Sequence, residues 1–164
     1  MLESLRHNFC VFFRDNRIEY GWIEDVHKDK FIVVPQKGKN QILPLNRIAF
    51  SWRGEKLTYN SKQSHELLKQ HLKTAFLFMK KLELETIHCL LDEVREYTID
   101  EIAMDFLDDP IDSVCKLGLF LALRADVFWF KHNRNLTYTP RTLDELELLR
   151  IQLARQKERQ DRAN

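Results

Sequence analysis

Four aspartates within eight positions are the residues most able to hold a metal ion. The cluster consists of Asp105, Asp108, Asp109 and Asp112. Carboxylate oxygens suit a hard cation such as Mg²⁺, but apolar residues that favour burial interrupt this segment. Asp109 precedes Pro110, a pair typical of a helix start, and Asp112 would follow in the first turn, where the helix dipole favours an acid. We therefore predict helix capping here and no metal site.

The six histidines and three cysteines form no recognisable catalytic arrangement. His65 and His71 are six positions apart, which predicts different faces of one helix. No HExxH, GxSxG, P-loop or GxGxxG pattern occurs. The cysteines, at positions 10, 89 and 115, are odd in number and widely spaced. This spacing allows no disulfide framework or CxxC site and favours a reducing cytoplasm, so we expect small buried hydrophobes and no catalytic residue.

Basic residues beside aromatic segments make nucleic-acid binding the favoured function. Single-stranded RNA needs cations that follow its phosphates and ring faces on which its bases stack. Most of the aromatic residues must nevertheless form the core of a small fold, and the lysines of residues 36–40 also suit a solvated turn. The predicted RNA-binding residues are Arg14, Arg17, Lys28, Lys37, Lys39, Arg47, Arg53, Lys131 and Arg134.

The first third of the chain predicts five short strands and no helix. The strands span residues 9–14, 18–25, 30–35, 41–45 and 47–52. They are rich in Phe, Val and Ile and are separated by turn residues. This pattern is typical of a small SH3-like β-barrel, which we place at residues 1–58. Closure of the barrel would leave no long sheet edge unprotected.

From Ser61 onward the hydrophobic period becomes helical. Helices are predicted at residues 61–82, 85–96, 98–107, 111–124 and 143–162, with a β-hairpin at 127–140. Thr98 with Glu101, and Thr142 with Glu145, have the spacing of capping boxes. The order of helices followed by a hairpin predicts a winged helix-turn-helix domain over residues 61–141. A charged helical extension over 142–164 would lead toward a following domain, and the chain is α+β.

The predicted winged helix is acidic where a DNA-reading domain should be basic. Residues 83–126 contain 3 basic and 12 acidic residues, a net charge of −9, although the whole chain has a net charge of +1. In its recognition helix only Lys116 and Arg124 are cationic, so DNA phosphates would be repelled. The basic hairpin tip could still contact RNA. The alternative is that the acidic helices bind a protein partner.

Five segments of the chain together resemble a known family. They are residues 21–25 (GWIED), 30–34 (KFIVV), 96–103 (EYTIDEIA), 128–131 (FWFK) and 138–141 (YTPR). The chain resembles the N-terminal region of ribonuclease II-type (RNB-family) 3′→5′ exoribonucleases, in the subgroup with a helix-turn-helix module before the catalytic domain. The resemblance implies a non-catalytic RNA-binding module. It implies that Mg²⁺ belongs to the parent's catalytic domain, which needs hundreds of residues absent here.

Two functions from different classes follow from these observations. The first is a module that binds or positions single-stranded RNA during RNA decay or processing, without being an enzyme itself and without a cofactor. The second is a protein-interaction adaptor that uses its acidic winged helix, and a DNA-binding regulator is less favoured. The longest uncharged apolar run, residues 117–123, is too short to span a bilayer. The N-terminus lacks a secretory signal, so we predict a cytoplasmic protein with no membrane partner.

Overall fold

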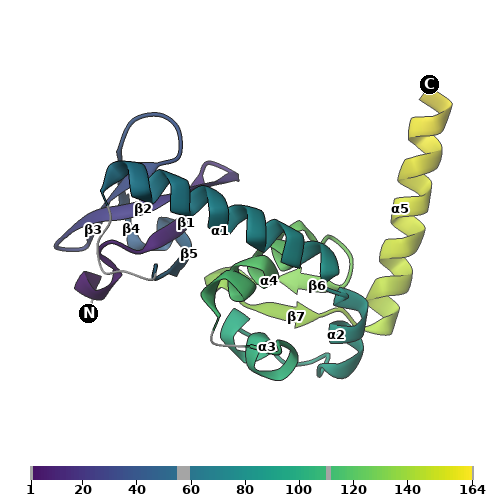
Figure 1. Cartoon of the computed structure of the whole chain (residues 1–164). Coiled ribbons are helices and arrows are strands. Elements are labelled where there is room, and N and C mark those ends of the chain that lie inside the picture. Colours follow the sequence, from purple (N-terminus) through teal and green to yellow (C-terminus); the bar gives the residue numbers. More distant parts are fainter. Residues whose placement is uncertain (1, 55–59, 110–111, 164) are drawn as a thin grey trace.

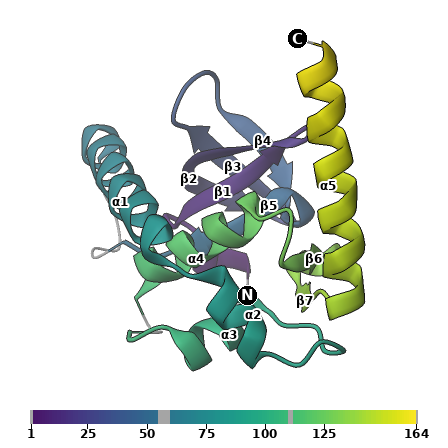
Figure 2. The same ribbon diagram turned by 90° about the vertical axis from the view of Figure 1, so that its right-hand side faces the viewer.

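The computed structural model describes residues 2–54, 60–109 and 112–163. In these residues the chain is α+β, with a five-stranded antiparallel sheet, five α-helices and a two-stranded hairpin before the last helix. Figure 1 shows that the first half of helix α1 (Ser61–Lys81) lies over the sheet and that its second half lies over the helical part. Helix α5 (Leu143–Ala163) begins beside the hairpin, and its later turns extend away from it in both views (Figure 1, Figure 2).

The five strands form one antiparallel sheet with apolar residues on both faces. They are β1 (Phe9–Arg14), β2 (Arg17–His27), β3 (Lys30–Pro35), β4 (Gln41–Pro44) and β5 (Ile48–Trp52), in the order β4-β3-β2-β1-β5. Side chains alternate along a strand, so Cys10 and Phe12 join a cluster on one face. Phe9 and Val11 join the core shared with the helices on the other. This two-sided burial explains why β1 is almost continuously apolar.

The sheet is not the closed barrel that the sequence analysis predicts. Strands β4 and β5 are its two edges and do not pair with each other. A 3-10 turn at Leu45–Arg47 carries the chain straight from β4 to the far side of β1, where Ile48 lies opposite Phe12. The prediction of closure is therefore wrong. The five predicted strands are present, with ends that differ from the predicted ones by two residues or fewer.

Helix α1 begins at a capping box that the sequence analysis did not find. The Asn60 side chain accepts from the Gln63 backbone N–H, and the Gln63 side chain accepts from the Asn60 N–H. Its two histidines contact different tryptophans of the sheet, on β2 and β5. The His65 ring packs edge-on against Trp22 at 4.7 Å between centroids, and Nδ1 of His71 accepts from Nε1 of the buried Trp52 at 2.9 Å.

The helical part contains three shorter helices and the hairpin. They are α2 (Leu84–Leu90), α3 (Ile99–Phe106), α4 (Ser113–Ala125), and strands β6 (Phe130–His132) and β7 (Tyr138–Pro140). Both predicted capping boxes form, at Thr98 with Glu101 and at Thr142 with Glu145. The helix predicted over 85–96 is shorter because the Asp92 side chain accepts from the Val94 N–H and starts a turn. Tyr97 then pairs with Tyr138 beside the hairpin.

Helices α1 and α4 approach closely enough to require a glycine. A Cβ atom added to Gly118 would lie 2.9 Å from the Ala75 carbonyl oxygen and 2.8 Å from a Phe78 ring carbon. On another side of α4, the Phe120 ring stacks on Phe50 of β5 with centroids 5.6 Å apart. The hydrophobic core therefore runs without a break from the sheet through α1 to α4. The division into domains at residues 58 and 61 stays a prediction.

Substitution of Gly118 tests this close approach. Alanine has a higher helix propensity than glycine by about 1 kcal/mol, so Gly118→Ala should stabilise α4 if nothing opposes it. We expect instead a net loss of about 1–3 kcal/mol in the free energy of unfolding, because the added methyl group meets backbone. Urea denaturation followed by circular dichroism measures the change. Unchanged or increased stability would show that α1 and α4 are not in this contact.

Candidate nucleic-acid interface

A cleft of about 600 Å³ lies between the sheet and the β6–β7 hairpin. Phe13 and Asn46 line it from the sheet side, Arg124 from the last turn of α4, and His132 and Arg134 from the hairpin. The described residues that line the cleft include no Asp or Glu. Although the helical part is acidic overall, the cleft thus combines cations, ring faces and side-chain amides.

Arg124 links the end of α4 to the sheet side of the cleft. Its guanidinium carbon lies 5.3 Å from the centroid of the Phe13 ring, a cation–π geometry. Its Nη2 donates to the backbone carbonyl of Asn16, in the turn between β1 and β2, at 3.4 Å. A cation at a helix C-terminus is also favoured by the helix dipole. Arg124 is therefore held in place over an aromatic ring, with one side facing the cleft.

The hairpin tip is a tight loop that presents Arg134. Asn135 and Leu136 both have a left-handed backbone, with φ of 64° and 58°. The Asn133 N–H donates to the Thr137 carbonyl at 2.9 Å, and the Asn133 side chain donates to Thr139 Oγ1 at 2.7 Å. These bonds close the loop and leave the Arg134 side chain exposed at the mouth of the cleft.

Tyr138 forms part of the hairpin wall of the cleft. Burial raises the pKa of its phenol to about 12, although the charge of Arg124 acts in the opposite direction. The His132 ring packs edge-on against the Tyr138 ring with centroids 5.4 Å apart. The phenol is therefore neutral at physiological pH, so this wall adds no negative charge to the cleft.

One of the predicted RNA-binding residues, Arg134, lines this cleft. Arg47 and Arg17 do not line it, although Arg47 follows the lining residue Asn46 and Arg17 follows Asn16, whose carbonyl accepts from Arg124. By its sequence Arg124 is only one of two cations on its helix, and it was not assigned to the site. An arginine in the last turn, directly after the apolar run 117–123, is the signal that could have identified it.

The other six predicted residues lie outside the lining of the cleft. Arg14 pairs with Glu19 at 3.4 Å, and Lys131 pairs with Glu145 at 3.2 Å. Lys37 lines a hollow of about 250 Å³ that Glu19 and Tyr20 also line. The exposed residues Lys28, Lys39 and Arg53 occupy the β2–β3 turn, the β3–β4 loop and the position after β5. Their role in binding stays a prediction.

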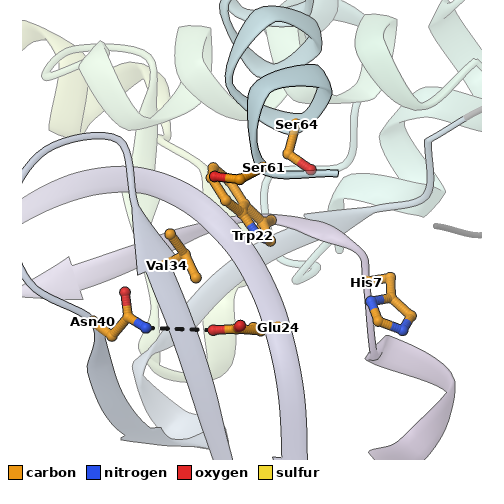
Figure 3. A pocket seen from close by; sticks show the side chains of 7 residues that line it. All are labelled: His7, Trp22, Glu24, Val34, Asn40, Ser61 and Ser64. Atoms are coloured by element: carbon orange, nitrogen blue, oxygen red, sulfur yellow. Dashed lines mark hydrogen bonds between the residues drawn. The ribbon is translucent and has the colours of Figure 1, made fainter. Parts of the chain in front are cut away.

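A second pocket, of about 410 Å³, lies between the sheet and the start of α1 (Figure 3). Trp22 and Val34 line it from the sheet, and Ser61 and Ser64 line it from the helix. On its open side Asn40 Nδ2 donates to Glu24 Oε2 at 3.3 Å (Figure 3). Its described lining contains a carboxylate and neither Lys nor Arg, so the pocket is a poor site for a phosphate.

Within the acidic cluster, Asp112 caps helix α4. Asp112 accepts from the backbone N–H groups of Val114 and Cys115 at 2.8 and 3.1 Å. The N-cap of α4 is therefore Asp112 and not Asp109 as predicted, because its carboxylate reaches two free N–H groups at once. Pro110 lies outside the described residues. Within the described ranges no group of three or more His, Cys, Asp or Glu is placed to hold a metal ion.

The three cysteines differ in their surroundings. Cys10 is buried within the sheet, and burial raises the pKa of its thiol. Cys115 is half-buried, and burial together with the nearby Asp112 raises its pKa. Cys89 is exposed, so the expectation of three buried cysteines is wrong for this one. It lies on α2.

Comparison with protein-family models, curated proteins and solved structures finds no match for this chain. None of the helices within residues 2–54, 60–109 and 112–163 has the length and apolar character needed to cross a membrane.

Substitutions of Asp112 separate a capping role from a metal-binding role. Asparagine caps a helix about as well as aspartate, whereas alanine does not. We expect Asp112→Asn to keep the free energy of unfolding and Asp112→Ala to lower it by about 0.5–2 kcal/mol. Thermal denaturation with and without millimolar Mg²⁺ measures both effects. A melting temperature that rises with Mg²⁺ in the wild type and not in Asp112→Asn would contradict the capping assignment.

The raised pKa of Tyr138 predicts a loss of stability at high pH. Because its folded-state pKa of about 12 exceeds the ordinary value of 10.0, folding favours the neutral phenol. The contribution of Tyr138 to the free energy of unfolding is complete below pH 10 and is lost as the pH rises toward 12. Phenolate absorbance and urea denaturation across this range measure it. Tyr138→Phe should flatten the decline, and an identical decline in the variant would refute the assignment to Tyr138.

Proposed function

We propose that this chain binds single-stranded RNA and that the cleft between the sheet and the β6–β7 hairpin is the interface. The observation that carries the proposal is the lining of that cleft. It brings Arg124 and Arg134 together with the rings of Phe13 and His132, and its described lining holds no carboxylate. In a chain whose net charge is only +1, such a local excess of cations supports binding to phosphates.

The side chains of the cleft divide into two chemical roles. Arg134 at the mouth and Arg124 deeper inside are suited to phosphate oxygens, since a guanidinium binds them in a bidentate manner. The half-buried Phe13 ring and the exposed His132 ring offer faces to unstacked bases. Asn46 and Asn133 offer amides to base edges. Because Phe13 already lies under a guanidinium, a base would extend an existing cation–π stack.

The burial of α4 argues against this helix as a recognition helix for duplex DNA. A recognition helix must present its side chains to the major groove. All residues of α4 from Leu117 to Leu123 are buried, and Gly118 packs against α1. The exposed acids before α4 would also repel phosphates. A single strand entering the cleft beside α4 avoids both difficulties.

The proposal also includes the fold type of the sheet and of the helical part, and the family that the chain resembles. The order of the five strands supports an SH3-like sheet, though an open one. The bridge between Tyr97 and Tyr138 adds a third strand position to the hairpin, which supports a winged helix-turn-helix. With the segments that resemble RNB-family exoribonucleases, these features support a non-catalytic, cytoplasmic RNA-binding module. Its parent's separate catalytic domain would hold Mg²⁺.

Salt-dependent RNA binding tests the cleft. We expect Arg134→Gln to weaken binding of a fluorescein-labelled oligouridylate and to reduce the logarithmic salt slope by roughly 0.7, the value for one lost contact to a single strand. Fluorescence anisotropy at several salt concentrations measures both. Arg134 is exposed at a loop tip, so the substitution leaves the core intact.

Lys37 and Lys39 provide the matched control. Their double substitution by Gln removes two exposed cations from the β3–β4 loop, outside the cleft. We expect a smaller effect from this double variant than from Arg134→Gln alone. If the Lys37 and Lys39 double variant loses more RNA affinity than Arg134→Gln, RNA binds along the β3–β4 loop and the assignment of the cleft is wrong. If neither variant changes the affinity, the RNA-binding proposal itself fails.

A further inference from the structure

A groove of about 490 Å³ lies between α2, the side chain of Trp129 and the first turns of α5. Its charge is the opposite of that of the RNA cleft. Three carboxylates line it, from Glu85 on α2, Glu93 in the turn after α2, and Glu147 on α5, against the single cation Arg150. The guanidinium of Arg150 lies over the Phe128 ring, 5.9 Å from its centroid. The groove is therefore a negatively charged site with an aromatic wall.

Trp129 is held firmly in the wall of this groove. The Asp126 carboxylate accepts from the backbone N–H groups of Phe128, Trp129 and Phe130, at 3.2, 3.1 and 2.9 Å. The Trp129 carbonyl accepts from the Arg141 N–H at 2.9 Å. The indole also packs against the His88 ring with centroids 5.1 Å apart. A half-exposed indole fixed in this way presents a preformed face to a ligand.

His88 adds a hydrogen-bond acceptor that the fold does not use. Its side chain lines the groove although the residue is only 5% exposed. Its Nε2 lies 2.7 Å from the Arg141 carbonyl oxygen, and a carbonyl can only accept, so Nε2 carries the proton. In the neutral ring Nδ1 is then the acceptor; it is buried and has no partner among the described residues. A buried acceptor without a donor is costly, so a ligand whose N–H group reached Nδ1 would be favoured.

We propose that this groove binds an arginine side chain of a protein partner. A guanidinium stacks on an indole face and donates several hydrogen bonds in one plane. Its apolar stem suits Leu91 and Leu146, which are buried beneath the groove, while the carboxylates of Glu85 and Glu147 balance its charge. The same carboxylates disfavour RNA here. The site is separate from the RNA cleft, and its proposal does not rest on RNA binding.

Two residues of the groove, Trp129 and Cys89, can report on ligand binding. Trp129 is half-exposed, whereas Trp22 and Trp52 are buried, so a ligand in the groove should shift the indole N–H signal of Trp129 alone. Cys89 lines the groove and is exposed, while Cys10 is buried and Cys115 is half-buried. A ligand should therefore also slow the reaction of the Cys89 thiol with Ellman's reagent.

The experiment compares N-acetyl-arginine amide with N-acetyl-citrulline amide, which has nearly the same shape and no charge. We expect the arginine compound to shift the Trp129 indole signal to saturation in the millimolar range and to protect Cys89. The citrulline compound should do neither, and N-acetyl-lysine amide should bind more weakly. Glu147→Gln, an exposed substitution on α5, should weaken arginine binding about two- to fivefold, as expected for the loss of an exposed ion pair.

Glu66→Gln is the control, because Glu66 is an exposed carboxylate on α1 outside the groove. It should leave the affinity unchanged. Equal binding of arginine and citrulline, equal losses in the two variants, or a shift of Trp129 that never saturates would each overturn the proposal. Protection of Cys89 by oligouridylate instead of arginine would do the same and would assign the groove to RNA.

Discussion

The contact between α1 and α4 at Gly118 is the constraint on which the rest of the molecule depends. Because Gly118 has no side chain, α4 lies directly against Ala75 and Phe78 of α1. The first half of α1 is fixed on the tryptophans of the sheet through His65 and His71. One helix therefore sets the position of the sheet relative to α4, and the stack of Phe50 on Phe120 repeats that link. Phe120 and Arg124 of α4 line the cleft together with Phe13 of the sheet, so the same packing places these three side chains.

The two sites that we propose have opposite charges. The cleft gathers Arg124 and Arg134 where the sheet faces the hairpin tip. The groove gathers Glu85, Glu93 and Glu147 around Trp129, the residue before β6. The net charge of the chain is near zero although its two sites carry opposite charges. Because the charges are separated, the chain could bind a polyanion and a cationic side chain at the same time. The Asp126 side chain orders the residues before β6, so it influences the groove without entering it.

Local sequence signals were reliable where one short-range interaction decides the outcome. The Thr98 and Thr142 capping boxes form as predicted because each needs only residues three positions apart. The start of α4 was misplaced because two candidate acceptors, Asp109 and Asp112, compete within one turn. Only the geometry showed that Asp112 reaches two N–H groups. The helix predicted over 85–96 is too long because a turn starts at Asp92, whose side chain accepts from the Val94 N–H.

The sequence by itself determined the α+β class, the five strands, the helical second part and the helix-capping roles of particular residues, since periodicity and capping act over a few positions. It also identified the basic and aromatic residue types. Only the tertiary structure decided that the sheet stays open, that Arg124 lies over Phe13, and that Cys89 and Trp129 border one groove. These arrangements join residues that are far apart in the chain. Their distances depend on how these distant elements pack together, and no local pattern encodes that packing.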